Sequence, residues 1–138
     1  MKRRRAREIA LQFLYQLDVN GAVDPRPYEY DFWIRQSEVD PPTREYAGAL
    51  IHGAKDQQPK IDELITRSTE HWDLERMSVV DRNILRLAVF ELGWQPDVPP
   101  KVAINEAIEI AKKFGTRESS RFINGVLDRV HRELRPAS

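Results

Sequence analysis

Apolar residues recur at spacings of three and four along nearly all of this 138-residue chain. Such spacing places apolar side chains on one face of a helix, whereas strict alternation of apolar and polar residues would predict a strand. No stretch shows sustained alternation bounded by turn residues. The pattern therefore predicts an all-α fold of six or seven helices. Hydrophobic residues make up 41% of the chain, enough to fill one sizeable core or two small fused ones.

Glycine and proline residues divide this pattern into segments. The first stripe ends at Asn20 and Gly21, and residues 24–42, which hold four of the nine prolines, predict a short helix inside a loop. Pro59 is expected to kink or divide the stripe that follows. Further helices are predicted over residues 78–93, 99–115 and 116–134. No low-complexity region or long linker interrupts them, so residues 1–138 are expected to form a single helical domain.

The stripe over residues 99–115 is wider than a one-sided surface helix needs, because Ile108 and Phe114 extend it around the helix. We therefore expect this segment to be the central, buried helix. Glu106 and Glu109 lie three residues apart on it and could be interpreted as paired catalytic carboxylates. Because two lysines follow one turn later, the favoured interpretation is a solvated edge with ordinary surface ion pairs.

The charges balance, with 22 Lys and Arg against 22 Asp and Glu, but they are unevenly placed. Five cations stand within the first seven residues: Lys2, Arg3, Arg4, Arg5 and Arg7. A helix N-terminus carries a partial positive charge, so stability alone does not favour cations there. On a helical wheel Arg4 and Arg7 fall opposite the apolar stripe, and both are expected to project into solvent.

A phosphate backbone is the natural countercharge for this arginine-rich block. Guanidinium groups form bidentate hydrogen bonds with phosphate and stack on unpaired bases, which suits single-stranded RNA better than a duplex groove. The block therefore predicts RNA binding, with an incidental basic tail as the alternative. A second, looser basic group is the other candidate RNA surface: Lys112, Lys113, Arg117 and Arg121.

Nothing in the sequence indicates catalysis, a cofactor or a metal site. The chain has no cysteine, which excludes thiol nucleophiles, disulfides and thiolate metal sites. The three histidines, His52, His71 and His131, are scattered over different segments, and no glycine-rich loop suited to phosphate is present. We expect a protein that is not an enzyme.

Membrane insertion and export are not predicted either. No run approaches the roughly 18 consecutive apolar residues that cross a bilayer, and charges at positions 2 to 8 replace the apolar core of a signal peptide. The absence of cysteine fits a reducing compartment. These features predict a cytoplasmic protein without a membrane partner.

Four segments resemble blocks of the NusB family of bacterial transcription antitermination factors, in the same order and spacing. They read RRRAREIALQFLY from Arg3, DRNILRLAVFEL from Asp81, KVAINEAIEIAK from Lys101 and FINGVLD from Phe122. The resemblance implies two small fused helical bundles and no catalysis. It further implies pairing with the ribosomal protein NusE, binding to the boxA element of nascent ribosomal RNA, and action within the RNA polymerase antitermination complex.

The resemblance also assigns residues. Its RNA-binding set comprises the arginine-rich block together with Gln12 and Phe122. Glu118, Ser119 and Arg121 stand just before Phe122, in a loop or first helical turn whose backbone amides are also expected to meet phosphate. An aromatic residue that opens an apolar stripe, such as Phe122, is more often part of a core. The surface for the partner protein is expected near Arg76, Asp81 and Arg82, although each could instead be a helix cap or a solvated charge.

Two other classes of function stay open at the level of the sequence. A similar helical module precedes the catalytic domain of bacterial ribosomal RNA cytosine methyltransferases, so the chain could be a detached RNA-recognition module. Alternatively, it could be a helical protein-protein adaptor or a homodimer whose basic block only aids solubility. Salt-dependent RNA binding separates an RNA-binding protein from a protein-only adaptor.

Overall fold

The computed structural model describes residues 2–36, 38–69 and 73–134. These residues form seven α-helices and one short 3-10 helix, with no strand among them, so the all-α prediction is confirmed. The elements are α1 (Arg3–Val19), α2 (Arg26–Arg35), α3 (Pro41–Asp56), α4 (Gln58–Arg67), η1 (Leu74–Arg76), α5 (Val79–Trp94), α6 (Pro100–Phe114) and α7 (Ser119–Leu134).

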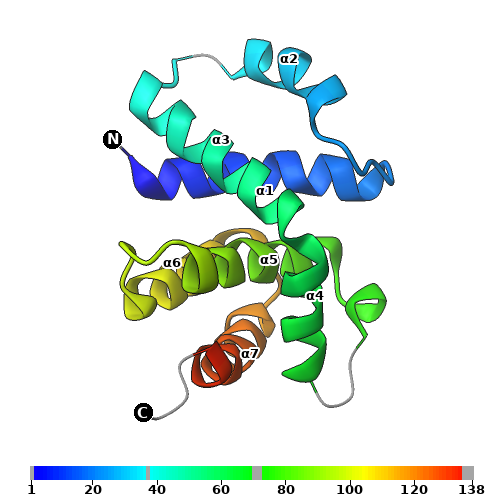
Figure 1. Ribbon diagram of the computed structural model, residues 1–138, viewed down its shortest axis with the longest axis vertical. Coiled ribbons are helices and arrows are strands. Elements are labelled where there is room, and N and C mark those ends of the chain that lie inside the picture. Colours follow the sequence, from blue (N-terminus) through cyan, green and yellow to red (C-terminus); the bar gives the residue numbers. More distant parts are fainter. Residues whose placement is uncertain (1, 37, 70–72, 135–138) are drawn as a thin grey trace.

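The helices form two small bundles that share one core (Figure 1). Helices α1, α2 and α3 lie together at one end, and α4 to α7 lie at the other. Helix α5 packs against α1 and α3 of the first bundle and against α4, α6 and α7 of the second. The buried apolar side chains therefore form a continuous cluster through both bundles.

Most helix boundaries follow the local signals in the sequence. The Asp40 carboxylate accepts a hydrogen bond from the Thr43 backbone N–H at 3.2 Å and so caps α3. The Ser78 hydroxyl caps α5 in the same way, accepting from the Asp81 N–H at 3.0 Å. Pro59 stands in the first turn of α4 and separates it from α3, as predicted.

The predicted central helix was wrong, because α5 and not α6 occupies the middle of the fold. Nine residues of α5 are buried, against five of α6. Helix α6 packs mainly against α5 and α7 and is joined to α1 by ion pairs, so the outer part of its wide apolar arc faces away from the core. Val102 and Phe114 are exposed and Ile108 is half-buried.

One close contact lies within the first bundle, and another joins that bundle to α5. Phe32, the one buried residue of α2, meets the Phe13 ring of α1 edge to face at 4.7 Å between centroids. Helix α3 approaches α5 at Gly53, where a Cβ atom would lie 2.0 Å from the Phe90 ring, so only glycine fits without movement of that ring. These contacts hold α2 against α1 and α3 against α5, and the outer face of α1 carries the candidate site.

Candidate nucleic-acid interface

The start of α1 is tied to the start of α3. The backbone N–H of Lys2 donates to the Thr43 hydroxyl at 3.0 Å, and that hydroxyl donates to the Asp40 carboxylate at 2.7 Å. The residue that caps α3 therefore also fixes the first turn of α1. This places the arginine-rich block on an ordered helix and not on a free tail.

Arg7 points into the protein, so the prediction that it projects into solvent was wrong. Its side chain is only 5% exposed. Its Nε and Nη2 donate to the two carboxylate oxygens of Glu91 on α5, at 2.7 and 2.9 Å. The buried arc of α1 is wider than the apolar stripe indicates, because α1 packs against both α3 and α5.

Further groups complete this buried cluster. The Tyr46 hydroxyl of α3 donates to Glu91 Oε2 at 2.7 Å, and Arg7 Nη1 donates to Glu106 Oε1 of α6 at 3.3 Å. Burial, and then the neighbouring Glu91 carboxylate, raise the pKa of Tyr46 to about 12, so its hydroxyl remains a donor. Side chains from four helices thus satisfy one another around the Arg7–Glu91 ion pair.

Arg4 is half-exposed but is also paired. Its Nε and Nη2 donate to the two carboxylate oxygens of Glu106, at 3.0 and 2.6 Å. The hydrogen bond from Arg4 lowers the pKa of Glu106, against the opposing effect of burial. The interpretation of Glu106 as part of a solvated edge was therefore wrong, whereas Glu109 does form the expected surface pair, at 3.5 Å from Lys112.

The other cations of the block face outward. Lys2, Arg3 and Arg5 are exposed, and the guanidinium groups of the two arginines approach a carboxylate only loosely, at 4.0 Å for Arg3 and 3.9 Å for Arg5. Glu8, the neighbour of Arg5, also pairs with Lys113 of α6 at 3.1 Å. The structure thus brings part of the second basic group beside the first.

A cavity of about 380 Å³ lies beside Arg5, where α1 meets the start of α5 and the end of α6. It is lined by Arg5, Glu8, Leu11, Gln12, Tyr15, Val80 and Phe114. Tyr15 and Phe114 are more than 40% exposed. Cationic, amide and aromatic side chains therefore converge at one hollow.

A second cavity, of about 260 Å³, is lined by residues that were predicted to have two different roles. Glu118 and Phe122, predicted to bind RNA, line it together with Arg76 and Asp81, predicted to bind a protein partner. One carboxylate oxygen of Asp81, Oδ1, is buried there without a hydrogen-bond partner among the described residues. Val80 lines the first cavity and Asp81 the second, so the start of α5 joins them.

The turn before α7 is fixed by Gly115. A Cβ atom at that position would lie 2.5 Å from the Ser119 hydroxyl, so a larger residue would displace Ser119. The Ser119 hydroxyl accepts a hydrogen bond from the Thr116 N–H at 2.9 Å, and its side chain is buried. Ser119 is therefore a positioning residue, whereas Arg121 is exposed on the first turn of α7.

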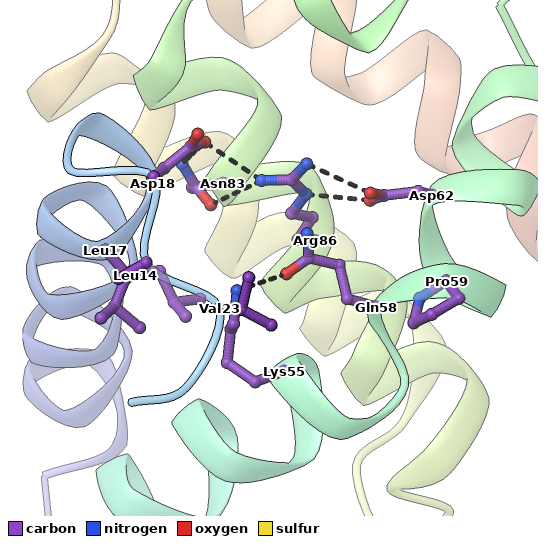
Figure 2. A pocket seen from close by; sticks show the side chains of 12 residues that line it. Leu14, Leu17, Asp18, Val23, Lys55, Gln58, Pro59, Asp62, Asn83 and Arg86 are labelled. Carbon is purple, nitrogen blue, oxygen red and sulfur yellow. Dashed lines mark hydrogen bonds and ion pairs between the residues drawn. The ribbon is translucent and has the colours of Figure 1, made fainter. Parts of the chain in front are cut away.

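Arg82, predicted to bind a partner, is paired with a carboxylate of the same fold. Its guanidinium group donates to both carboxylate oxygens of Asp18, at 2.7 and 2.6 Å. Arg86 joins Asp18 to Asp62 in the wall of a cavity of about 390 Å³ (Figure 2). Burial alone would raise the pKa of Asp18, but hydrogen bonds from Arg82 and Asn83 outweigh it and the pKa is lowered.

The described part of the chain shows neither a metal centre nor a membrane-spanning helix. No group of three or more histidine and acidic side chains is arranged to hold a metal ion there. His71 lies outside those residues. None of the described helices has the length and apolar character that crossing a membrane requires.

Comparison with known proteins shows to which protein family the chain belongs. The sequence model of the NusB family matches residues 4–132. The chain belongs to the NusB family. The transcription antitermination protein NusB of Desulfosudis oleivorans is 52% identical over 136 residues, which cover 96% of this chain and 86% of the relative.

Solved structures of the NusB family agree with this fold. The structure of T. maritima NusB is 41% identical, with a TM-score of 0.89, and the match covers 99% of this chain and 94% of that one. A chain in the crystal structure of the antitermination factors NusB and NusE in complex with double-stranded RNA is 27% identical, with a TM-score of 0.85. That match covers 96% of this chain and 99% of the other.

Tyr15, Phe114 and Lys113 line or flank the hollow of this NusB-family chain, and the first two were not predicted as site residues. Tyr15 carried a signal, because it is an aromatic residue on the polar side of the first helical stripe. Phe114 carried no such signal in the sequence, because its place in an apolar stripe predicts a buried side chain. Lys113 was noted only in the alternative basic surface.

Replacing Arg7 should destabilise the fold, because a buried Glu91 would be left without its countercharge. Arg7→Gln is expected to lower the free energy of unfolding by about 3 kcal/mol, measured by urea denaturation. Arg5→Gln is the matched control and should change it by less than about 0.5 kcal/mol. The double variant Arg7→Gln with Glu91→Gln should lose less than the sum of the two single variants. Equal stability of the two arginine variants would contradict the buried placement of Arg7.

Proposed function

We propose that this protein is an RNA-binding transcription antitermination factor that pairs with NusE and binds the boxA element of nascent ribosomal RNA. Its membership of the NusB family supports a role in transcription antitermination. The hollow beside Arg5 supports direct binding of RNA. The proposal contains no catalytic step. It places the protein in the cytoplasm, as a part of the RNA polymerase antitermination complex.

The hollow has the chemistry that single-stranded RNA requires. Lys2, Arg3 and Arg5 supply exposed cations along one end of α1. A single strand can lay its phosphates along such cations and stack its unpaired bases on aromatic rings. The exposed rings of Tyr15 and Phe114 lie next to Arg5 in this hollow, which is the observation that carries the proposal.

The second cavity extends this surface toward α7. Oδ1 of Asp81 has no hydrogen-bond partner among the described residues, and a carboxylate accepts hydrogen bonds from the exocyclic amines of cytosine and adenine. Phe122 and Glu118 lie in the same cavity, and Arg121 is exposed on the same turn of α7. An RNA strand would therefore pass from the start of α1, across the start of α5, to the start of α7.

Pairing with NusE is supported by the neighbouring structure, in which NusB and NusE form a complex with RNA. Arg76 is exposed at the edge of the second cavity and is available for a partner, whereas Arg82 is engaged inside the fold. Because Arg76 and Asp81 share a cavity with RNA-binding candidates, NusE would contact the protein beside the RNA. A homodimer that uses the same surface would compete with both.

Other functions are less well supported. The matched Desulfosudis oleivorans relative is an antitermination protein and is covered over 86% of its length, which favours this function over a methyltransferase module. A protein-only adaptor would not need exposed aromatic rings among cations. The neighbouring complex contains double-stranded RNA, so an RNA duplex is the second candidate ligand.

Substitutions in the hollow should distinguish the contribution of charge to RNA binding from the contribution of base stacking. Binding of a fluorescent boxA-like single strand is measured by anisotropy over a range of salt concentrations. Arg5→Gln should weaken binding and flatten the slope of log affinity against log salt by about 0.7. Tyr15→Ala should weaken binding by about tenfold with an unchanged slope, because a stacking contact releases no counterion.

Matched controls are available on surfaces away from the hollow. Lys60→Gln on α4 removes an exposed cation and Tyr30→Ala on α2 removes an exposed tyrosine ring, and both should leave affinity and slope unaltered. A duplex of the same sequence should not depend on Tyr15. If Tyr15→Ala and Tyr30→Ala bind the single strand equally well, the hollow is not the RNA site.

NusE should raise the affinity for RNA, since the chain has no net charge and offers little long-range attraction of its own. The same anisotropy titration is repeated with saturating NusE, and co-elution of the two proteins is measured by gel filtration. We expect a shared peak and tighter RNA binding with both proteins than with either alone. Separate peaks with unchanged RNA affinity would contradict pairing with NusE.

A further inference from the structure

Arg4 differs from the other exposed cations of the block, because a carboxylate of the same protein already holds its guanidinium group. Its Nε and Nη2 donate to Glu106 Oε1 and Oε2 at 3.0 and 2.6 Å. The guanidinium groups of Arg3 and Arg5 approach their nearest carboxylates only at 4.0 and 3.9 Å. Arg4 alone of these three makes a bidentate pair.

The Glu106 carboxylate is also held by an arginine in the interior of the protein. The buried Arg7 donates to its Oε1 at 3.3 Å, so Glu106 bridges one interior arginine and one surface arginine. The Glu106 side chain is 17% exposed, whereas that of Arg4 is 55% exposed. The hydrogen bond from Arg4 also keeps the pKa of Glu106 below its usual value, so the carboxylate is charged at neutral pH.

The Nε and Nη2 edge of the Arg4 guanidinium group, which Glu106 occupies, is an edge that an RNA phosphate also binds. Two parallel N–H donors bind carboxylate and phosphate alike, so an Arg4 held by Glu106 cannot give this edge to RNA as well. We propose, on the basis of the proposed RNA-binding function, that Glu106 competes with an RNA phosphate for Arg4 and thereby lowers the affinity for RNA. Bidentate binding of phosphate to this edge of Arg4 requires the exchange of one anion for another.

The test removes the negative charge of Glu106 and keeps the shape of its side chain. Glu106→Gln should raise the affinity for a boxA-like single strand by about two- to fivefold, the range expected when an exposed ion pair is released. It should also steepen the salt slope by about 0.7, because one more cation is free to neutralise phosphate. Glu109→Gln is the matched control: it removes the same charge from the next turn of α6, where the partner is Lys112 at 3.5 Å.

A double substitution shows whether the effect acts through Arg4. In an Arg4→Gln background, Glu106→Gln should give no increase in affinity. An equal increase with and without Arg4, or an equal increase for Glu109→Gln, would show a general charge effect and overturn the proposal. A loss of affinity in a folded Glu106→Gln variant would show that Glu106 presents Arg4 to phosphate, which also overturns it.

A measurement on the unmodified protein keeps the proposal testable if Glu106→Gln fails to fold. The Arg4 Nε–H resonance in a ¹⁵N NMR spectrum should shift when the RNA strand is added, as the carboxylate partner is replaced. An unchanged Arg4 resonance at saturating RNA would overturn the proposal. If the unmodified protein binds no RNA, the proposed function itself fails; if it binds RNA and Glu106→Gln brings no increase, only this inference fails.

Discussion

The ion pair between Arg7 and Glu91 is the interaction on which the rest of the structure depends. It joins α1 to α5 inside the protein, and Tyr46 and Glu106 extend it to α3 and α6. An isolated buried charge is costly, so the loss of one of these groups destabilises the charge that it leaves behind. The cluster fixes the rotation of α1 about its axis. It thereby determines that Arg5, Gln12 and Tyr15 lie on the outer face.

The five cations at the start of the chain have different roles. Arg7 stabilises the fold, Arg4 is held by Glu106 at the surface, and Lys2, Arg3 and Arg5 remain outside. The unfavourable effect of cations at a helix N-terminus is offset by internal carboxylates for Arg7 and Arg4. A block that is uniform in sequence is therefore not uniform in function.

Much of the fold could be predicted from the sequence, because its signals are local. The apolar spacings predicted the helices, and Pro59 and the helix start predicted at residue 78 are boundaries that the structure confirms. The central helix could not be predicted in the same way. The arcs of α5 and α6 are both broad, and only the number of helices packed around α5 distinguishes them.

The candidate site was predictable in its residue types but not in its geometry. Arg7 and Arg4 look equivalent on a helical wheel, and their partners Glu91 and Glu106 stand more than eighty residues away in the sequence. Such pairing depends on tertiary packing, and the spacing of residues along the sequence does not predict it. The resemblance to the NusB family supplied Gln12, Phe122 and Asp81, and the structure shows that the last two share a cavity.

The central claim is that RNA lies along the face that runs from the start of α1 across the start of α5 to the start of α7. Backbone chemical shifts of ¹⁵N-labelled protein, recorded during titration with a boxA-like single strand, test it most directly. The account predicts that the largest changes occur at Arg5, Gln12, Tyr15, Phe114 and Phe122, with little change on α2 and α4. Changes centred on α2, or on the cavity around Asp18 and Lys55, would contradict it.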